Sequence, residues 1–162
     1  MEWGDSVRAY DYLDQVKILD TLIFNKTAEQ EQLRELAEKI TQANDGMPHA
    51  SGVSDKIGNA VSGLVDLQNE TAVLVKTFKS VLQDVVKHIE MLPEEQYNIL
   101  HCKFIRKRKE LGNHRSWYHS WEEVAEIVGY SESQVYRIRK KALRNLQKIL
   151  DENMTVNDRV QV

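Results

Sequence analysis

The sequence has few of the residues that interrupt helices or cross-link a chain: its 162 residues include two prolines, seven glycines and one cysteine. Cys102 alone cannot form an internal disulfide, which suits a reducing cytosol. Strand-type alternation is nearly absent, so we expect an all-α fold. No apolar run approaches the roughly 20 residues that a membrane span needs, and the amino terminus lacks the basic and apolar regions of a secretion signal. We therefore expect a cytoplasmic protein without a membrane partner.

The residue patterns of common enzymes are missing too. His101, Cys102, His114 and His119 are metal-ligand types, but their spacing does not place pairs of them around zinc. The chain also has no glycine-rich phosphate loop and no nucleophile elbow. We expect neither an enzyme nor a bound metal or cofactor.

Charge of either sign is in little excess, with a net charge of -3. This small total hides an asymmetry, because residues 93–150 contain twelve Lys/Arg against seven Asp/Glu, a balance of +5, while the rest of the chain carries -8. Long-range attraction follows local potential rather than total charge. An acidic body with a basic carboxyl-terminal part predicts a polyanionic partner that only one end of the chain contacts.

Residues 1–92 are expected to form a helical hairpin or bundle. Two helical segments, 10–24 and 28–43, are separated by an expected break at 25–27, and a loop is predicted over 44–54. The long helix that follows repeats apolar residues in steps of four and three, as a coiled-coil seam does. Its expected members are Ile57, Val61, Leu64, Gln68, Thr71, Val75, Phe78, Leu82, Val85, Ile89 and Leu92.

Two polar residues interrupt this seam. Gln68 and Thr71 either fix the register and the choice of partner, as polar core residues do in coiled coils, or belong to the imperfect seam of an ordinary bundle. A neighbouring row widens the apolar face beyond one seam, which suits packing against two helices in a bundle or a dimer. The members of that row are Ala60, Leu67, Leu74, Val81 and Leu82.

Two helices joined by a tight turn are expected near the carboxyl terminus. Ser120 with Glu123, and Ser131 with Gln134, match the capping box that marks a helix start. Gly129 lies just past the first helix, where a left-handed backbone costs glycine nothing. The inward-facing residues are expected to be Val124, Ile127 and Val128 on the first helix and Val135, Ile138, Ala142, Leu146 and Ile149 on the second.

A basic segment precedes these two helices. A new helix is expected to begin at Pro93, and the segment 106–119 then mixes cations with aromatic and amide side chains. This mixture suits a loop that grips phosphates. The alternative is a solvated connector whose Trp117 or Tyr118 packs onto the core. The loop cations expected to contact DNA are Lys107, Arg108 and Arg115.

The second helix of the pair carries the expected DNA-reading residues. If it enters the major groove of double-stranded DNA, its first turns face base edges. Ser133, Gln134 and Arg137 are the expected readers, because Gln pairs in a bidentate manner with adenine and Arg with guanine. Glu132 suits the helix dipole and repels phosphate. The side chains expected to position the helix on the DNA backbone are Tyr136, Arg139, Lys140, Lys141 and Arg144, the last three having an ordinary solvated helix face as the alternative.

Residues 92–146 resemble region 4 of bacterial sigma factors. The shared features are the opening LPEEQYNILHCKFI, the turn of Gly, an aromatic residue and Ser, and the closing KALRNL. The upstream segments YLDQVKILDTLIFNK and SDKIGNAVSGLVDL are similar to phage-encoded late-gene transcriptional regulators of the RinA and ArpU type. These resemblances imply a DNA-binding activator of phage or prophage late genes in the bacterial host cytosol, with host RNA polymerase as a further partner.

The resemblance does not extend to the residues that select a DNA sequence. The sigma positions that read bases fall on Glu132, Ser133 and Arg137, and the chain departs at the first two, where sigma factors have Arg and Glu. The longer basic segment before the two helices is a further departure. The promoter sequence of sigma factors is therefore not carried over to this chain.

The chain is thus expected to have three parts: a helical oligomerisation or interaction region at 1–92, a sigma region 4-like helix-turn-helix domain at 93–150, and a flexible tail at 151–162. A homodimer or higher homo-oligomer is expected, because two linked DNA-binding units read a repeated site with greater avidity. The alternative function is that of a phage packaging or structural protein, such as a small terminase-like DNA-recognition subunit, which also joins a helix-turn-helix to an oligomerising helical region.

Overall fold

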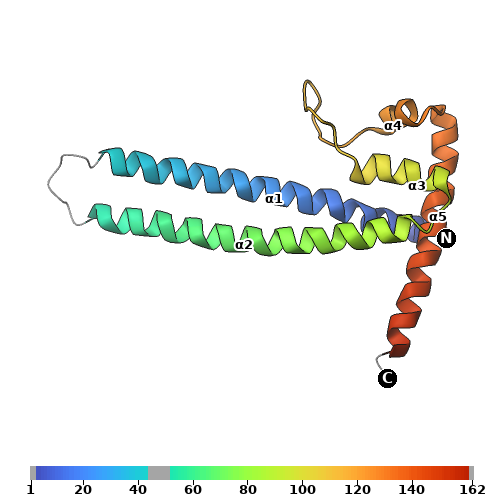
Figure 1. The fold of residues 1–162 in the computed structure, drawn as a ribbon, viewed down its shortest axis with the longest axis horizontal. Helices are drawn as coiled ribbons and strands as arrows, with labels where there is room; N and C mark the ends of the chain where they lie inside the picture. Colours follow the sequence, from blue (N-terminus) through green and yellow to red (C-terminus); the bar gives the residue numbers. More distant parts are fainter. Residues whose placement is uncertain (1–2, 44–51, 161–162) are drawn as a thin grey trace. The chain divides into compact units, whose positions relative to one another are not determined.

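The computed structural model describes residues 3–43 and 52–160, and over these ranges the protein is helical apart from turns, one longer loop and an isolated β-bridge. The expectation of an all-α fold is confirmed. Within the same ranges, none of the helices combines the length and apolar composition needed to cross a bilayer. The elements are α1 (Trp3–Ala43), α2 (Gly52–Ile89), α3 (Glu94–Leu100), the π-helical turn η1 (His101–Ile105), α4 (Trp121–Val128) and α5 (Glu132–Val160) (Figure 1).

The chain forms two compact units, one of residues 1–18 and 80–162 and the other of residues 19–79. In the unit 19–79, the segments of α1 and α2 run antiparallel and side by side (Figure 1). The break expected at 25–27 is wrong, since α1 continues through it. The segment has neither glycine nor proline, and the Thr27 hydroxyl donates to the Ile23 carbonyl at 2.9 Å within the helix.

The seam of this hairpin differs in part from the expected one. Val61, Gln68 and Val75 are exposed, whereas the neighbouring row of α2 faces α1 together with Leu64 and Thr71. When apolar residues recur in steps of three and four, two adjacent rows of the helix can both serve as a packing seam. The position of α1 decides which of the two rows is covered. The half-buried side chains of the seam are Ile23, Lys26, Gln30, Leu33, Ala37 and Ile40 on α1, and Ile57, Ala60, Leu64, Leu67, Thr71, Leu74 and Phe78 on α2.

A polar layer fixes how the two helices of the hairpin align. Gln30 Nε2 donates to Thr71 Oγ1 at 2.6 Å and to the Leu67 carbonyl at 3.2 Å. Nearby, Lys26 Nζ lies 3.2 Å from Glu70 Oε2. A slip of one helix turn would leave these partly buried polar groups without their partners. Of the two polar seam residues, Thr71 is thus hydrogen-bonded across the hairpin, whereas Gln68 is exposed.

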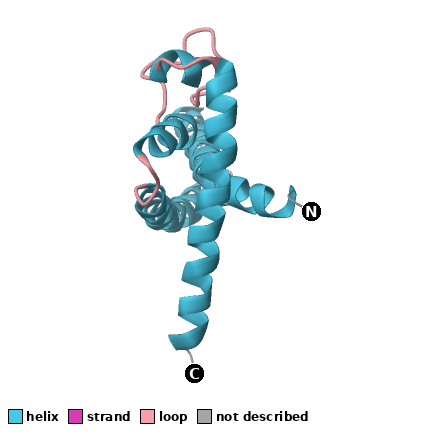
Figure 2. Ribbon diagram, turned by 90° about the vertical axis from the view of Figure 1, so that its right-hand side faces the viewer, coloured by secondary structure: helices cyan, strands magenta, loops and turns pink. Residues whose placement is uncertain are grey.

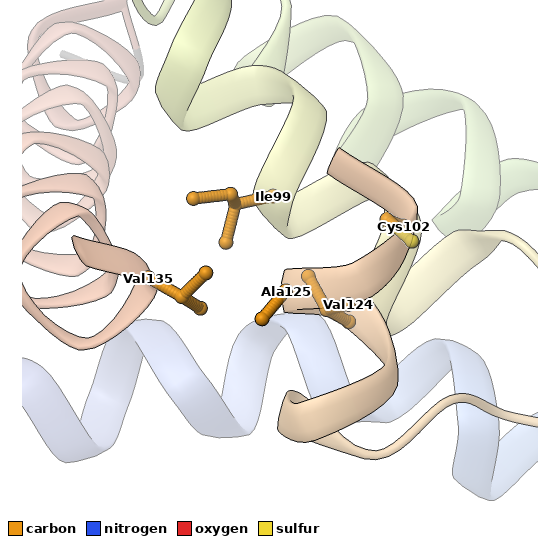
Figure 3. Packing of buried hydrophobic residues seen from close by; sticks show 5 residues of the cluster. All are labelled: Ile99, Cys102, Val124, Ala125 and Val135. Atoms are coloured by element: carbon orange, nitrogen blue, oxygen red, sulfur yellow. The ribbon is translucent and has the colours of Figure 1, made fainter. Parts of the chain in front are cut away.

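The fully buried core belongs to the other unit. Ile99 of α3, Cys102 of η1, Val124 and Ala125 of α4, and Val135 of α5 point toward one another (Figure 3). Burial raises the pKa of the Cys102 thiol, in keeping with a packed rather than a reactive side chain. Further residues with a relative exposure of 1% or less include Leu13 and Val16 of α1, Val85 and Ile89 of α2, and Ala142 and Leu146 of α5.

Helix α5 continues well past the expected end at Leu150. The structure shows helix up to Val160 in place of a tail without regular structure (Figure 2). No glycine or proline follows Gly129 in the sequence, so nothing in the backbone ends the helix. Asp151 also accepts from Gln147 Nε2 at 3.0 Å and lies 3.5 Å from Arg8, which ties this part of α5 to α1.

Candidate nucleic-acid interface

The turn between α4 and α5 is held by a capping box at each helix start. At α4, the Ser120 N–H donates to Glu123 Oε2 at 2.7 Å, and the Glu123 N–H donates to Ser120 Oγ at 3.3 Å. At α5, the Ser131 N–H donates to Gln134 Oε1 at 3.0 Å, and the Gln134 N–H donates to Ser131 Oγ at 3.2 Å. Gly129 adopts the left-handed backbone between them, with φ of 76°. Both predicted caps and the predicted glycine turn are confirmed.

The inner faces of the two helices follow the predicted pattern with one exception. Val124 and Val135 are buried, and Val128 and Ile138 pack against them. Ile127 is the exception, because 42% of its surface remains exposed. The buried position beside Val124 is taken by Ala125.

Trp121 at the start of α4 is enclosed by cations and an aromatic ring. The guanidinium carbon of Arg139 lies 4.5 Å from the indole centroid, and Lys103 Nζ lies 5.3 Å from it. Phe104 meets the indole edge-on, with ring centroids 6.1 Å apart. Lys103 also donates to the His119 carbonyl at 2.8 Å, and burial, followed by the repulsion of neighbouring cations, lowers the pKa of Lys103. Arg139, expected to contact the DNA backbone, is thus half-buried against Trp121.

The outward side of α5 carries a row of exposed cations. Arg137, Lys140, Lys141 and Arg144 are all exposed, and their i, i+3, i+4, i+7 spacing places them on one side of the helix. Lys140 Nζ lies 5.0 Å from the ring centroid of Tyr136, which is itself 55% exposed. The structure therefore brings three of the predicted positioning residues, Lys140, Lys141 and Arg144, onto one side of α5 together with the predicted reader Arg137.

Two hollows flank Arg137. One of about 560 Å³ lies between the start of α4 and the first turns of α5, and Ser133, Tyr136 and Arg137 line part of it. The other, of about 310 Å³, lies toward α3, and its lining includes Gln134, Arg137 and Lys141. Arg137 is the residue that both share, so it stands at the centre of the expected reading surface.

Gln134 has two roles that compete. Its Oε1 accepts hydrogen bonds from the Ser131 N–H at 3.0 Å and from the Ser131 hydroxyl at 3.2 Å. A bidentate pair with adenine needs the same oxygen together with the amide nitrogen. Only the amide nitrogen of Gln134 is left outside the capping box for a base.

The loop between η1 and α4 is partly ordered by its own backbone. Lys107 and Tyr118 form an antiparallel bridge, and the Arg108 N–H donates to the Trp117 carbonyl at 2.8 Å. Tyr118 is buried, as the connector alternative expects, while Trp117 is 37% exposed. Lys107 and Arg115 are exposed cations, as the phosphate-gripping alternative expects. In Figure 1 the tip of this loop and helix α5 lie on opposite sides of α4.

Arg108 differs from the other predicted DNA contacts. Its guanidinium pairs with Glu123 and donates to the Ser116 carbonyl at 3.0 Å, leaving 12% of the side chain exposed. Its charge anchors the loop to α4 instead of facing solvent, a correction to the expected phosphate contact. The sequence does not reveal the pairing of Arg108 with Glu123, because the two residues lie fifteen positions apart. The only local pattern around Glu123 is the capping box.

Glu123 is the electrostatic centre of this anchor. Hydrogen bonds from Arg108 and from the Ser120 N–H lower the pKa of Glu123 to about 2. His114 Nδ1 and His119 Nδ1 lie 3.5 Å and 3.8 Å from its oxygens. Burial, followed by the nearby Arg108 charge, lowers the pKa of His119, which favours the neutral ring at this site.

Among the described residues, no three His, Cys, Asp or Glu side chains gather in a way that would hold a metal ion. No protein-family model, curated protein or solved structure matches the chain. Function is therefore inferred from the side chains and from the resemblance of residues 92–146.

Proposed function

We propose that the protein is a sequence-specific regulator of transcription that binds double-stranded DNA in the bacterial cytosol and activates late genes of a phage or prophage. The observation that carries the proposal is the exposed cationic side of α5 directly after a turn that is capped at both helix starts. The caps fix where α4 and α5 begin, and an exposed basic helix that follows such a turn suits the major groove. The sigma region 4 resemblance supports the same function and adds RNA polymerase as a partner.

Each part of the reading surface has a proposed task. Ser133 and Arg137 contact base edges, with Gln134 contributing its amide nitrogen. Lys140, Lys141 and Arg144 contact phosphates on either side of the groove, and Lys107 and Arg115 add a second group of phosphate contacts from the loop. The hairpin of α1 and α2 joins copies of the chain into a homodimer or higher homo-oligomer, so that two DNA-binding units engage one repeated site.

Selection of bound sequences from random duplex DNA, at two salt concentrations, tests the proposal. A defined motif that persists at the higher salt is the expected result, because base contacts are less sensitive to salt than phosphate contacts. Binding that is tight at low salt, selects no motif and disappears as salt rises would show only a basic helix on a polyanion. That outcome would contradict a sequence-specific regulator.

Two single substitutions separate reading from positioning. Arg137→Ala should weaken binding by about 1–3 kcal/mol at one base pair of the motif and relax the preference there. Lys141→Ala should weaken binding to all DNA sequences alike, and it should lower the slope of log affinity against log salt concentration by about one. Lys39→Ala is the matched control, because it removes an exposed cation from α1 in the hairpin. A uniform loss for Arg137→Ala would contradict its reading role.

A third substitution addresses the double role of Gln134. Glutamate serves in a capping box as glutamine does, so Gln134→Glu keeps the start of α5 while removing the amide donor. We expect unchanged helix content and a changed base preference at one position of the motif. If the preference stays the same, Gln134 acts as a cap only.

The alternative, a DNA-recognition subunit of a packaging machine, is favoured by one observation: the hairpin 19–79 contains no buried side chain among its described residues, which suits assembly into a larger helical body. Small terminase subunits form rings. A mass corresponding to eight or more copies in light scattering would favour this alternative, and a mass of two copies would favour the regulator.

A further inference from the structure

Arg139 differs from the other cations in the first turns of α5. Arg137, Lys140 and Lys141 are exposed, whereas Arg139 is half-buried. Its guanidinium carbon lies 4.5 Å from the indole centroid of Trp121, and among the described residues it has neither a hydrogen bond nor an ion pair. A guanidinium in this place is attracted by the negative face of the ring. The indole at the start of α4 is therefore the partner that holds Arg139.

The contact between Arg139 and Trp121 joins two helices, unlike the other cation–aromatic pair of α5. Lys140 Nζ lies 5.0 Å from the ring centroid of Tyr136, four residues earlier on the same helix. A pair within one helix cannot fix how that helix lies on its neighbours. Trp121 belongs to α4 and packs against the buried core. Arg139 therefore ties α5 to a point outside α5.

This contact is suited to set the rotation of α5 about its own axis. Val135 and Ile138 contact the core through apolar side chains, and apolar contacts have little directionality. The capping box at the start of α5 joins residues of the turn and of α5 alone. A polar contact to α3, in which Asn145 Nδ2 donates to Gln96 Oε1 at 2.9 Å, lies about two turns from Arg137.

A small rotation of α5 is enough to misdirect Arg137. Arg137 and Arg139 belong to the same helical turn, and both line the hollow of about 560 Å³ beside Trp121. At the outer radius of a helix, about 6 Å, a rotation of about 10° moves a side-chain end by about 1 Å. A precise polar contact needs its groups held within about 0.5 Å. Loss of the Arg139 contact would thus reach the base contact through the helix itself.

We infer that Arg139 and Trp121 act as a positioning pair, which sets the rotation of α5 and thereby the direction in which Arg137 meets a base edge. Arg139 itself contacts neither a base nor a phosphate. The inference deepens the proposed function by giving a contact inside the protein a role in sequence selection. It rests on that function, because the reading role of Arg137 is part of it.

The test measures binding of the full chain to the selected duplex and to duplexes changed at single base pairs, over a series of salt concentrations. The discrimination ratio is the affinity for the selected duplex divided by the affinity for a changed one. Partial unfolding of a variant lowers both affinities alike, so a mere loss of stability does not alter this ratio. The slope of log affinity against log salt concentration reports the phosphate contacts.

Arg139→Ala should lower the discrimination ratio about tenfold at the base pair that Arg137→Ala affects, and it should leave the salt slope unchanged. Trp121→Leu should have the same effect, because it removes the other half of the pair. The double variant should lose no more than either single variant, as expected for two residues that act through one contact.

Two variants serve as matched controls. Lys140→Ala removes the adjacent, exposed cation, and it should lower the salt slope by about one while keeping the discrimination ratio within about twofold. Asn145→Ala removes a contact between helices about two turns from Arg137. It should lower the free energy of unfolding without changing the ratio.

A lower salt slope with an unchanged ratio for Arg139→Ala would make Arg139 a phosphate contact and overturn the inference. Equal losses of the ratio for Arg139→Ala and Asn145→Ala would overturn it by showing a general loosening. Additive losses for Arg139→Ala and Trp121→Leu would overturn it by showing separate roles.

The outcomes also separate this inference from the proposed function. A wild type that selects no motif contradicts the proposed function and the inference together. A wild type that selects a motif, with an Arg139→Ala variant that selects it as sharply, contradicts the inference alone and leaves the regulator standing.

Discussion

Replacing Glu123 by glutamine should loosen the loop 106–120 from helix α4 while leaving the helix cap in place. Glutamine at the third helical position keeps the reciprocal capping bonds with Ser120. What it removes is the negative charge that faces Arg108, whose side chain is 12% exposed. The guanidinium then remains mostly buried beside a neutral partner, which costs more than losing a solvent-exposed ion pair.

The size of this effect follows from the pKa of Glu123, which is lowered from 4.5 to about 2. That difference corresponds to about 3 kcal/mol in favour of the ionised form. A quarter of the Glu123 side chain is exposed, so solvent screening reduces the expected loss of unfolding free energy to about 1–2 kcal/mol at pH 7. Because the folded pKa is the lower one, this stabilisation is present above pH 4.5 and is lost as the pH falls toward 2.

Urea denaturation followed by tryptophan fluorescence measures this loss, since Trp121 lies in the same unit. Glu122→Gln is the matched control, because it removes the same charge from the same exposed helix start without touching Arg108. The difference in unfolding free energy between the wild type and Glu123→Gln should become smaller as the pH is lowered from 6 to 3. Equal losses for the two variants, or a gap independent of pH, would refute a stabilising role for the Arg108 pair.

Three further substitutions test other parts of the fold and its surface. Gly129→Ala should lower the free energy of unfolding by about 1 kcal/mol or more in urea melts, because φ of 76° strains any residue with a Cβ. Thr71→Val should cost about 1 kcal/mol by the same measurement, since Gln30 loses its 2.6 Å hydrogen bond. In a salt titration of DNA binding, Arg144→Ala should lower the slope as Lys141→Ala does, and an unchanged slope would remove it from the phosphate contacts.

The helix starts of the candidate interface were predictable from the sequence because their signals act over a few residues. Ser120 with Glu123 and Ser131 with Gln134 lie within one helical turn, so side chain and backbone meet whatever the rest of the chain does. The left-handed turn at Gly129 also depends only on its immediate neighbours. The predicted break at 25–27 failed because this segment contains neither glycine nor proline, and α1 continues through it.

The sequence by itself therefore determined that the protein is helical, where α4 and α5 begin, and which cations share one side of α5. Only the tertiary structure decided that Arg108 pairs with Glu123 and that Arg139 and Lys103 enclose Trp121. It also decided that one row of α2 meets α1 while Val61, Val65 and Val75 stay exposed. Capping and helical periodicity depend on neighbours within one or two turns. Pairing and burial depend on which distant segments meet, and a repeat with two equivalent apolar rows cannot specify that choice alone.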